Sequence, residues 1–189
     1  MTEDDLCFLP ATRLAGLIRR RAVSPLEVTR AVLERIERVN PALNAYCTVA
    51  ADEALVAARA ATRALHRRAP LGPLHGVPVS IKDLTPTKGI RTTYGSKIYE
   101  HHVPDEDGLI VTRLKAAGAI VIGKTNTPEF GAGGNTYNAV FGATRNPWNP
   151  ALTCGGSTGG GGAALAAGLA PLAQGSDLGG SLRVPAAFC

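Results

Sequence analysis

Residues 1–70 carry apolar side chains at the three- to four-residue spacing of amphipathic helices. This pattern predicts one helix over residues 11–21, where three arginines gather in the last turn and suit the helix dipole. It predicts a second helix that stops at the Asn-Pro pair at 40–41, and an alanine-rich third helix over 50–65 that ends before 69–70. We therefore expect this part of the chain to be a helical N-terminal segment.

The start of the second helix is marked by local capping chemistry. Ser24 can act as the N-cap, because its side-chain oxygen can accept a hydrogen bond from a free backbone N–H of the first turn. Pro25 suits the first helical position, where no N–H is needed, and Glu27 completes a capping box with Ser24. The sequence thus predicts a helix that begins at Pro25.

Beyond the helical segment the pattern changes to short apolar runs. A run rich in β-branched residues over 76–84, an amphipathic stretch over 107–119 and an apolar run over 119–126 predict a strand, a helix and a strand. Residues 160–168 are typical of a helix of small side chains, and 169–177 of a strand that leads into a glycine turn. Because this order is typical of parallel sheets, we expect an α/β fold with a mixed, largely parallel central sheet covered by helices.

The composition is that of a soluble globular protein. The chain has 189 residues, 45% of them hydrophobic, and no run approaches the roughly 18 apolar residues that a membrane span requires. The N-terminal MTEDDLCFLP has acids where a signal peptide has basic residues, so we expect a cytoplasmic protein. The four cysteines lie far apart and form no C-x-x-C pair, so we expect no metal site and no disulfide framework.

The formal net charge of +5 raises the question of a nucleic-acid partner. The basic residues gather locally, at residues 19–21 and 67–68, in or beside the predicted helices. Few aromatic residues accompany them, which weakens the stacking modes of RNA recognition. Solvated helix faces are therefore the favoured interpretation, and nucleic acid is not an expected partner.

Residues 155–183 combine many glycines with serines, among them Ser157 and Ser181. The stretch GGSTG matches the G-x-S-x-G nucleophile elbow, but a loop precedes it instead of an apolar strand, and all four histidines precede Ser157, so none can follow it as the base. No phosphate-binding glycine motif is present either. What remains is an activated serine whose base is not histidine.

Lysine can act as such a base when burial or nearby positive charge lowers its pKa. Lys82 fits this requirement, because it follows Val77, Val79 and Ile81 at the end of a strand expected to be buried. Most lysines are simply surface residues, so the local sequence leaves both interpretations of Lys82 open.

Several long segments resemble the amidase signature family: GVPVSIKDLTPTKGIRTTYGS at 76–96, GKTNTPEFG at 123–131, NPWNPALTCGGSTGG at 146–160 and GSDLGGSLRVPAAFC at 175–189. The family's chains are considerably longer. The resemblance therefore implies that residues 1–189 are the N-terminal part of a single amidase domain, with a helical segment over 1–70 and the catalytic signature core over 71–189. It implies no cofactor and no metal.

The resemblance also implies a Ser-cisSer-Lys triad. The serine that ends the family's D-x-G-G-S motif, the acyl-forming nucleophile, falls on Ser181. The first serine of the G-G-S-S motif, which is held by a cis peptide bond, falls on Ser157, and the lysine of the I-K-D motif falls on Lys82. In such a triad Ser157 passes a proton between Ser181 and Lys82.

The neighbouring residues receive further roles from the resemblance. The expected oxyanion hole consists of the N–H groups of Leu178, Gly179, Gly180 and Ser181. Gly131 and Thr158 are expected to contact substrate, although the family often has a second serine where Thr158 stands. Ser176, Asp177 and Arg183 are expected to be structural, with Asp177 and Arg183 forming an ion pair that stiffens the turn.

The favoured function is an amide-bond hydrolase that forms a serine acyl-enzyme on a small-molecule amide. One alternative is the glutaminase subunit of a tRNA-dependent amidotransferase, the only case in which we expect a nucleic-acid partner. Such subunits often carry glutamine just after the arginine that follows the nucleophile, and Val184 at this position favours the hydrolase. Another alternative is an inactive truncated fragment. A homodimer is compatible with the sequence, and no membrane partner is expected.

Overall fold

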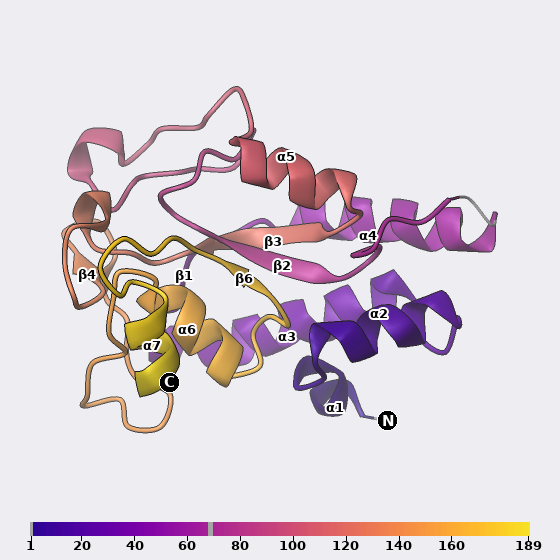
Figure 1. Ribbon diagram of the computed structural model, residues 1–189, viewed down its shortest axis with the longest axis horizontal. Helices are drawn as coiled ribbons and strands as arrows, with labels where there is room; N and C mark the ends of the chain where they lie inside the picture. Colours follow the sequence, from indigo (N-terminus) through magenta and orange to yellow (C-terminus); the bar gives the residue numbers. More distant parts are fainter. Residues whose placement is uncertain (1, 68–69) are drawn as a thin grey trace.

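The computed structural model describes residues 2–67 and 70–189, and the sheet lies at its centre (Figure 1). Its strands are β1 (Tyr46–Val49), β2 (Pro78–Lys82), β3 (Ile120–Thr125) and β6 (Ala173–Gln174), in the spatial order β1-β3-β2-β6. Strand β2 is parallel to both β3 and β6, and β1 is antiparallel to β3. The fold is therefore the expected mixed, largely parallel α/β arrangement.

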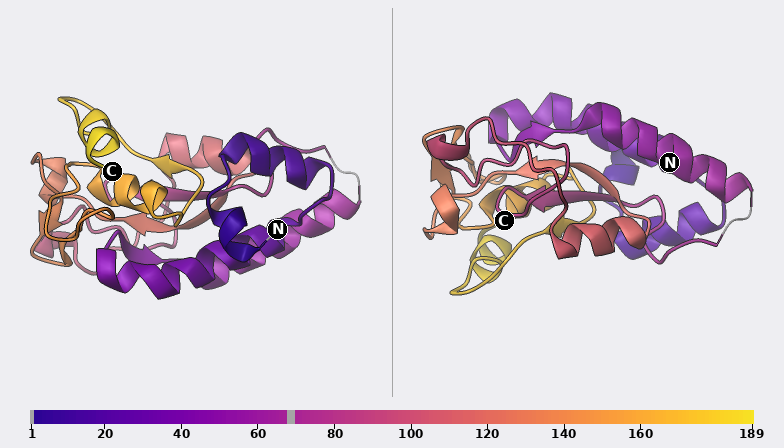
Figure 2. Two further views of the ribbon diagram at one scale, coloured as in Figure 1. Left: turned by 90° about the horizontal axis from the view of Figure 1, so that it is seen from below. Right: turned by 90° about the horizontal axis from the view of Figure 1, so that it is seen from above.

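The helices are α1 (Glu3–Cys7), α2 (Ala11–Arg19), α3 (Pro25–Leu43), α4 (Ala51–His66), α5 (Leu109–Ala116), α6 (Gly159–Ala166) and α7 (Arg183–Phe188). Two 3₁₀ turns, η1 (Lys97–Tyr99) and η2 (Glu129–Gly131), and a short hairpin of β4 (Tyr137–Asn138) and β5 (Gly142–Ala143) complete the described elements. In both views of Figure 2 the long helices α3 and α4 lie on one side of the sheet, and α7 projects from the opposite side.

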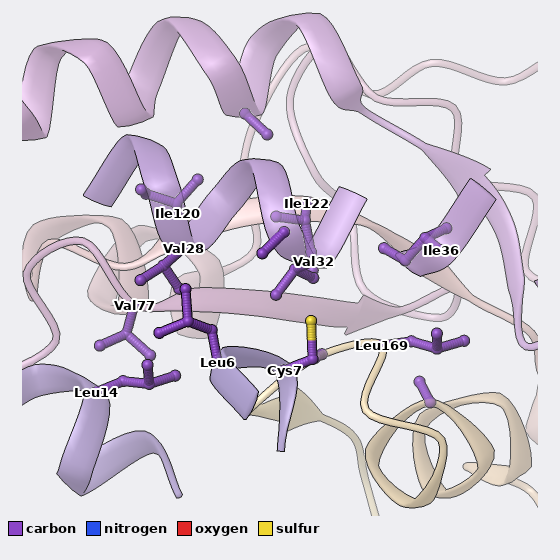
Figure 3. Close-up of a cluster of buried hydrophobic side chains, with 14 of the residues drawn as sticks. Leu6, Cys7, Leu14, Val28, Val32, Ile36, Val77, Ile120, Ile122 and Leu169 are labelled. Carbon is purple, nitrogen blue, oxygen red and sulfur yellow. The ribbon is translucent and has the colours of Figure 1, made fainter. Parts of the chain in front are cut away.

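Helices cover the central strands on both faces, which explains why every residue of β2 and β3 is buried. On one face, Val77, Ile120 and Ile122 pack against Val28 and Val32 of α3, together with side chains of α1 and α2 (Figure 3). On the other face, a second cluster joins Val79, Ile81 and Val121 to Val111 of α5. In β3 the consecutive residues Ile120, Val121 and Ile122 alternate between these two clusters, as the two-residue period of a strand requires.

The register between β2 and β3 contains one irregularity. Val79 pairs with Val121, but the next residue, Ser80, pairs with Gly123, so one residue of β3 is passed over. From there the pairing is regular, and it ends with Lys82 opposite Thr125. Lys82 is therefore the last residue of a strand that is hydrogen-bonded to a neighbour on each side.

The prediction for the start of α3 is confirmed. Ser24 Oγ accepts a hydrogen bond from the N–H of Glu27 (3.1 Å), and Glu27 Oε2 accepts one from the N–H of Ser24 (2.7 Å). The predicted stop at residues 40–41 is wrong, because α3 continues through Pro41 to Leu43. Proline here removes only one hydrogen bond from the last turn, and Asn44 then ends the helix in a left-handed conformation.

Other expectations need smaller changes. The helix expected over 50–65 is α4, and one of the two residues at its expected stop, 69, lies outside the described residues, as does Arg68. The strand expected over 169–177 is reduced to β6, because only Ser80 and Ile81 of β2 pair with it. Within residues 2–67 and 70–189, no helix combines the length and the apolar character that a membrane span requires.

Candidate active site

Lys82 lies at the end of β2 with its side chain completely buried. Its Nζ donates hydrogen bonds to Ser157 Oγ (2.7 Å), Thr158 Oγ1 (2.9 Å) and Ser176 Oγ (3.4 Å). The structure thus brings together Lys82 and Ser157, which are 75 positions apart in the sequence. Every side-chain oxygen that receives a hydrogen bond from this amine is a hydroxyl.

The environment of Lys82 lowers its pKa from the usual 10.5 to about 8. Burial is the main cause, because removal from water disfavours the charged ammonium. The carboxylate of Asp177 acts in the opposite direction and limits the decrease. A substantial fraction of Lys82 is consequently neutral at mildly alkaline pH, which is the form that can accept a proton.

Ser157 lies in the turn that leads into α6, and its peptide bond with Gly156 is cis. Gly156 packs directly against the backbone of residues 134 and 135: a Cβ atom at this position would lie 3.0 Å from Asn135 N and from Gly134 C. That contact is tighter than ordinary packing allows, so only glycine fits here without movement of the neighbouring loop. Ser157 itself is buried, with 3% of its surface exposed.

The segment that carries Ser181 is fastened to the Ser157 segment through Thr158. The N–H of Thr158 donates to the carbonyl oxygen of Ser181 (3.0 Å), and the hydroxyl of Thr158 donates to the carbonyl oxygen of Ser176 (3.3 Å). Thr158 therefore contacts the amine of Lys82 and both ends of the 176–181 turn. Among the described residues, no hydrogen bond joins the side chains of Ser157 and Ser181 directly.

Asp177 organises the turn around Ser181. Its carboxylate accepts hydrogen bonds from the backbone N–H groups of Gly180 (2.7 Å), Leu182 (2.9 Å) and Arg183 (3.2 Å). It also forms a bidentate ion pair with the Arg183 guanidinium, in which Nη2 lies 2.9 Å from Oδ1 and Nε lies 3.1 Å from Oδ2. The hydrogen bond from Arg183 is the largest of the effects that hold the pKa of Asp177 far below its ordinary value. The carboxylate thus remains ionised and fixes the turn.

The four N–H groups expected to form the oxyanion hole differ in their present partners. The N–H of Gly180 donates to Asp177. Those of Leu178, Gly179 and Ser181 donate to no acceptor among the described residues. Leu178 and Gly179 are exposed, and nothing lies within 4 Å of a Cβ placed on Gly179, so this side of the turn is open.

Gly131, at the end of η2, lies beside Ser157. A Cβ atom placed on Gly131 would be 3.6 Å from Ser157 Oγ and 2.6 Å from Leu84 Cδ1. The backbone of Gly131 has φ = +72°, a left-handed conformation that favours glycine. A side chain here would have to displace Leu84, which lies two residues after Lys82, so glycine fits beside Ser157 without moving Leu84.

Two further polar residues contact Lys82. Gln174, which the sequence did not single out, accepts hydrogen bonds at Oε1 from the backbone N–H of Lys82 (3.3 Å) and from the hydroxyl of Thr85 (3.2 Å). Ser176, expected to serve only the turn, places its hydroxyl at the Lys82 amine. These contacts of Lys82 join positions more than 90 residues apart, so no local pattern in the sequence could have indicated them.

A second buried lysine, Lys124, lies on the neighbouring strand β3. Its Nζ donates to the carbonyl oxygen of Thr85 and to the hydroxyls of Thr87 (3.0 Å) and Thr92 (2.9 Å). Burial lowers its pKa to about 8 as well. Among the described residues, no group of three or more His, Cys, Asp or Glu side chains lies close enough to hold a metal ion.

Comparison with known proteins gives consistent matches along the chain. The family model described as Amidase matches residues 27–189. A glutamyl-tRNA(Gln) amidotransferase subunit from Acidothermus cellulolyticus is 50% identical over 183 residues, which cover 97% of this chain and 36% of that protein. An acylamidase from Rhodococcus erythropolis is 43% identical over 189 residues, which cover 100% of this chain and 40% of that protein.

Solved structures agree with these matches. The structure described as fatty acid amide hydrolase has a TM-score of 0.94 and 31% sequence identity, and the match covers 100% of this chain and 34% of that one. The present chain spans 36–40% of the length of the two curated relatives above. Because the family model covers most of its length, the chain belongs to the amidase signature family.

Proposed function

We propose that this chain carries the catalytic centre of an amide-bond hydrolase, in which Ser181 is the nucleophile, Ser157 the proton relay and Lys82 the base. The observation that carries the proposal is the buried Lys82 amine, with a pKa of about 8, hydrogen-bonded at 2.7 Å to Ser157 Oγ. A serine hydroxyl needs such a base, because almost none of it is ionised at neutral pH.

In this mechanism neutral Lys82 accepts the proton of Ser157 while Ser157 accepts the proton of Ser181. The Ser181 oxygen attacks the carbonyl carbon of the amide and forms a tetrahedral intermediate. Collapse of that intermediate breaks the C–N bond, and the proton returns from Lys82 through Ser157 to the departing amine. Water then attacks the acyl-enzyme with the help of the same relay and releases the carboxylic acid.

The open side of the 178–181 turn supports a role for its backbone in holding the oxyanion. The N–H groups of Leu178, Gly179 and Ser181 have no protein acceptor among the described residues, so a negatively charged oxygen could accept hydrogen bonds from them. Removing one donor of this kind typically raises the barrier by about 3–4 kcal/mol. Gly131 and Thr158, on either side of Ser157, are the proposed substrate contacts.

We assign this activity to the protein at its full length, with the present chain as the N-terminal part of a single amidase domain. The names of two similar proteins, an acylamidase and a fatty acid amide hydrolase, support a small-molecule amide as the substrate. A cytoplasmic location forms part of the same proposal.

The test is covalent labelling of the full-length protein with a fluorophosphonate, which reacts with activated serines. We expect the wild type to be labelled, Ser181→Ala to be unlabelled, and Lys82→Ala and Ser157→Ala to be labelled far more slowly. Thr112→Ala, at an exposed position on α5, is the control and should be labelled normally. Labelling that persists in Ser181→Ala would remove Ser181 as the nucleophile.

A second candidate function is supported by the 50% identity to a subunit of glutamyl-tRNA(Gln) amidotransferase. In that case the same centre would release ammonia from glutamine and work with partner subunits and a tRNA. Glutaminase activity that rises only when partner subunits and aminoacyl-tRNA are added would favour this function. Turnover of simple amides by the full-length protein alone would favour the hydrolase.

A further inference from the structure

Gln174 is the last residue of β6, and it lies beside the end of β2, where Lys82 is (Figure 1). Its backbone pairs with that of Ile81, and this is the last pair between the two strands. Its side chain reaches further along the chain. Oε1 accepts one hydrogen bond from the N–H of Lys82 (3.3 Å) and another from the hydroxyl of Thr85 (3.2 Å). One oxygen of Gln174 therefore holds two donors from the stretch that carries the proposed base.

The backbone of Lys82 is held at both of its polar groups. Its N–H donates to Gln174, and its carbonyl oxygen accepts a hydrogen bond from the N–H of Thr85 (3.0 Å), which closes a turn after β2. Because the hydroxyl of Thr85 donates to the same oxygen of Gln174, the strand end and the turn are fixed together. The amine of a lysine lies at the end of a long flexible stem. Where the Lys82 amine can lie thus depends on how firmly this backbone is held.

The other end of the Gln174 amide holds the segment that supplies a partner of the amine. Nε2 donates to the carbonyl oxygen of Gly175 (3.1 Å). The next residue is Ser176, whose hydroxyl accepts a hydrogen bond from the Lys82 amine. Gly175 also packs tightly against Thr158, because a Cβ atom placed on it would overlap the Thr158 side chain. Gln174 therefore joins the backbone that carries the amine to the backbone beside its hydroxyl partners.

Glutamine suits this place because its amide combines an acceptor and a donor. The oxygen can accept two hydrogen bonds while the nitrogen donates. Methionine has a similar length but makes none of these hydrogen bonds, and an ionised glutamate keeps the acceptor but has no donor. Among the described residues, no hydrogen bond joins the Gln174 side chain to Ser157 or Ser181. Gln174 is thus outside the set of proposed reacting groups.

From these contacts we propose that Gln174 is a positioning residue that holds the Lys82 amine within hydrogen-bonding distance of the Ser157 hydroxyl. This inference rests on the proposed amide hydrolase function, in which Lys82 is the base. Gln174 acts through the backbone of Lys82 and takes no part in proton transfer. Proton transfer needs heavy-atom distances of about 2.6–3.2 Å, so a looser Lys82 backbone slows the reaction without weakening the binding of substrate.

The experiment measures labelling of the full-length protein by a fluorophosphonate at several concentrations. This series separates the maximal labelling rate, kinact, from the apparent dissociation constant of the reagent, KI. We expect Gln174→Met to lower kinact about 10- to 100-fold, because a small displacement of a catalytic group is costly. KI should change less than about twofold, since Gln174 does not contact the bound reagent in this proposal.

Thr62→Val is the matched control. Thr62 is half-buried, like Gln174. Its hydroxyl also accepts a hydrogen bond from a backbone N–H, that of Leu26 (3.3 Å), and donates to a carbonyl oxygen, that of Ala58 (2.8 Å). These hydrogen bonds join α3 to α4 and involve no residue of the candidate active site. We expect Thr62→Val to keep the wild-type kinact, even where urea unfolding shows that it loses as much stability as Gln174→Met.

Gln174→Glu provides a second test, which also decides the matter if Gln174→Met does not fold. It keeps an acceptor for Lys82 and Thr85, so its kinact at alkaline pH should be at least about threefold higher than that of Gln174→Met. Its carboxylate also favours the charged form of Lys82, which raises the pKa of the amine. The midpoint of the pH dependence of kinact should therefore move upward from that of the wild type, and an unchanged midpoint would contradict the proposal.

Three further outcomes would overturn the positioning role while the wild type is labelled at Ser181. They are equal losses of kinact in Gln174→Met and Thr62→Val, a rise in KI as large as the fall in kinact, and a Gln174→Glu variant no faster than Gln174→Met. The proposed hydrolase function fails in a different way. In that case the wild type is not labelled at all, or Ser181→Ala is labelled as readily as the wild type.

Discussion

The two buried lysines, Lys82 and Lys124, invite comparison because so much about them is alike. Each lies near the end of one of two neighbouring parallel strands, each is completely buried, and burial lowers the pKa of each to about 8. They differ in the hydrogen-bonding groups that surround the amine. Burial alone therefore does not make a lysine a base, and the partners decide which protonation state the site prefers.

Around Lys124 every partner acts as an acceptor. The Thr85 partner is a carbonyl oxygen, the hydroxyl of Thr87 already donates to that same carbonyl (3.1 Å), and the hydroxyl of Thr92 donates to the carbonyl of Ile90 (3.0 Å). Three acceptors require three N–H donors, which only the charged ammonium provides. The carboxylate of Asp83 also raises the pKa of Lys124. These partners favour the charged form of Lys124 and a structural role for it.

Around Lys82, two of the partner hydroxyls have a proton that is not already donated to another described residue. The hydroxyl of Thr158 donates to the carbonyl of Ser176, but the hydroxyls of Ser157 and Ser176 donate to no other described residue. A hydroxyl can reverse its role and donate to a neutral amine. The proton of Ser157 can therefore move to Lys82 without leaving a buried group unpaired, as a relay requires.

The largest expected effect is on catalytic activity, which should depend far more on Lys82 than on Lys124. Lys82→Met should lower kcat/KM for an amide by about 10²–10⁴-fold, because it removes the proposed general base. Lys124→Met should lower it less than about tenfold, since Lys124 contacts none of the reacting groups. Steady-state kinetics of the two variants checks this. Comparable losses in both would mean that the two lysines do not divide their roles in this way.

The next expected effect is on stability, and here Lys124→Met should be the more strongly affected of the two variants. Lys124→Met should lower the free energy of unfolding by about 1–3 kcal/mol, because it leaves buried oxygens without a donor. Lys82→Met should lower it by less than about 1 kcal/mol, since the hydroxyls of Ser157 and Ser176 can donate to other groups. Urea unfolding of both proteins measures the difference, and a more destabilised Lys82→Met would contradict the assignment of donors and acceptors.

A third effect concerns pH. In the proposed mechanism the active form of Lys82 is the neutral amine, so kcat/KM should rise with pH and be half-maximal near its pKa of about 8. Because Lys124 contacts none of the proposed reacting groups, Lys124→Met should keep the same midpoint. A pH–rate profile of the wild type and this variant provides the measurement. A rate that falls as pH rises through 8 would exclude a neutral Lys82 as the base.

The smallest effects come from one hydroxyl partner of each lysine. Thr158→Val removes an acceptor of Lys82 and should lower kcat/KM about 2- to 10-fold with little loss of stability. Thr87→Val removes an acceptor of Lys124 and should lower the free energy of unfolding by about 1 kcal/mol with little change in kcat/KM. Steady-state kinetics and urea unfolding of both variants test this. A larger activity loss in Thr87→Val, or a larger stability loss in Thr158→Val, would contradict the different roles of the two lysines.

Features that depend on nearby residues could be predicted from the sequence. The capping box of Ser24 and Glu27 spans a single turn, and the strand that ends at Lys82 follows from a short run rich in β-branched residues. The resemblance to the amidase signature family singled out Lys82, Ser157 and Ser181, and the structure brings Lys82 and Ser157 into contact. The assigned roles of these residues stay predictions.

Features that depend on distant contacts could not be predicted. Strand β1 has only four residues, and it forms because β3 provides a neighbour. Helix α7 contains Pro185, which in the sequence argues against a helix although it is tolerated in the first turn. The sequence likewise does not reveal that Lys124 donates to residues of the 85–92 loop, or that Ser176 reaches Lys82, because both contacts depend on tertiary packing.

The pairing between β2 and β3 skips Ile122 of β3. The number of residues in this region therefore decides which side chains lie opposite one another at the strand ends. Neighbouring strand positions face opposite ways, and the residue beside Lys82 is Asp83. If one residue were inserted into or deleted from β2, the hydroxyl of Ser157 would meet an acid or an aliphatic side chain in place of an amine. Evolution and protein engineering can therefore exchange side chains along this strand far more readily than they can change its residue count.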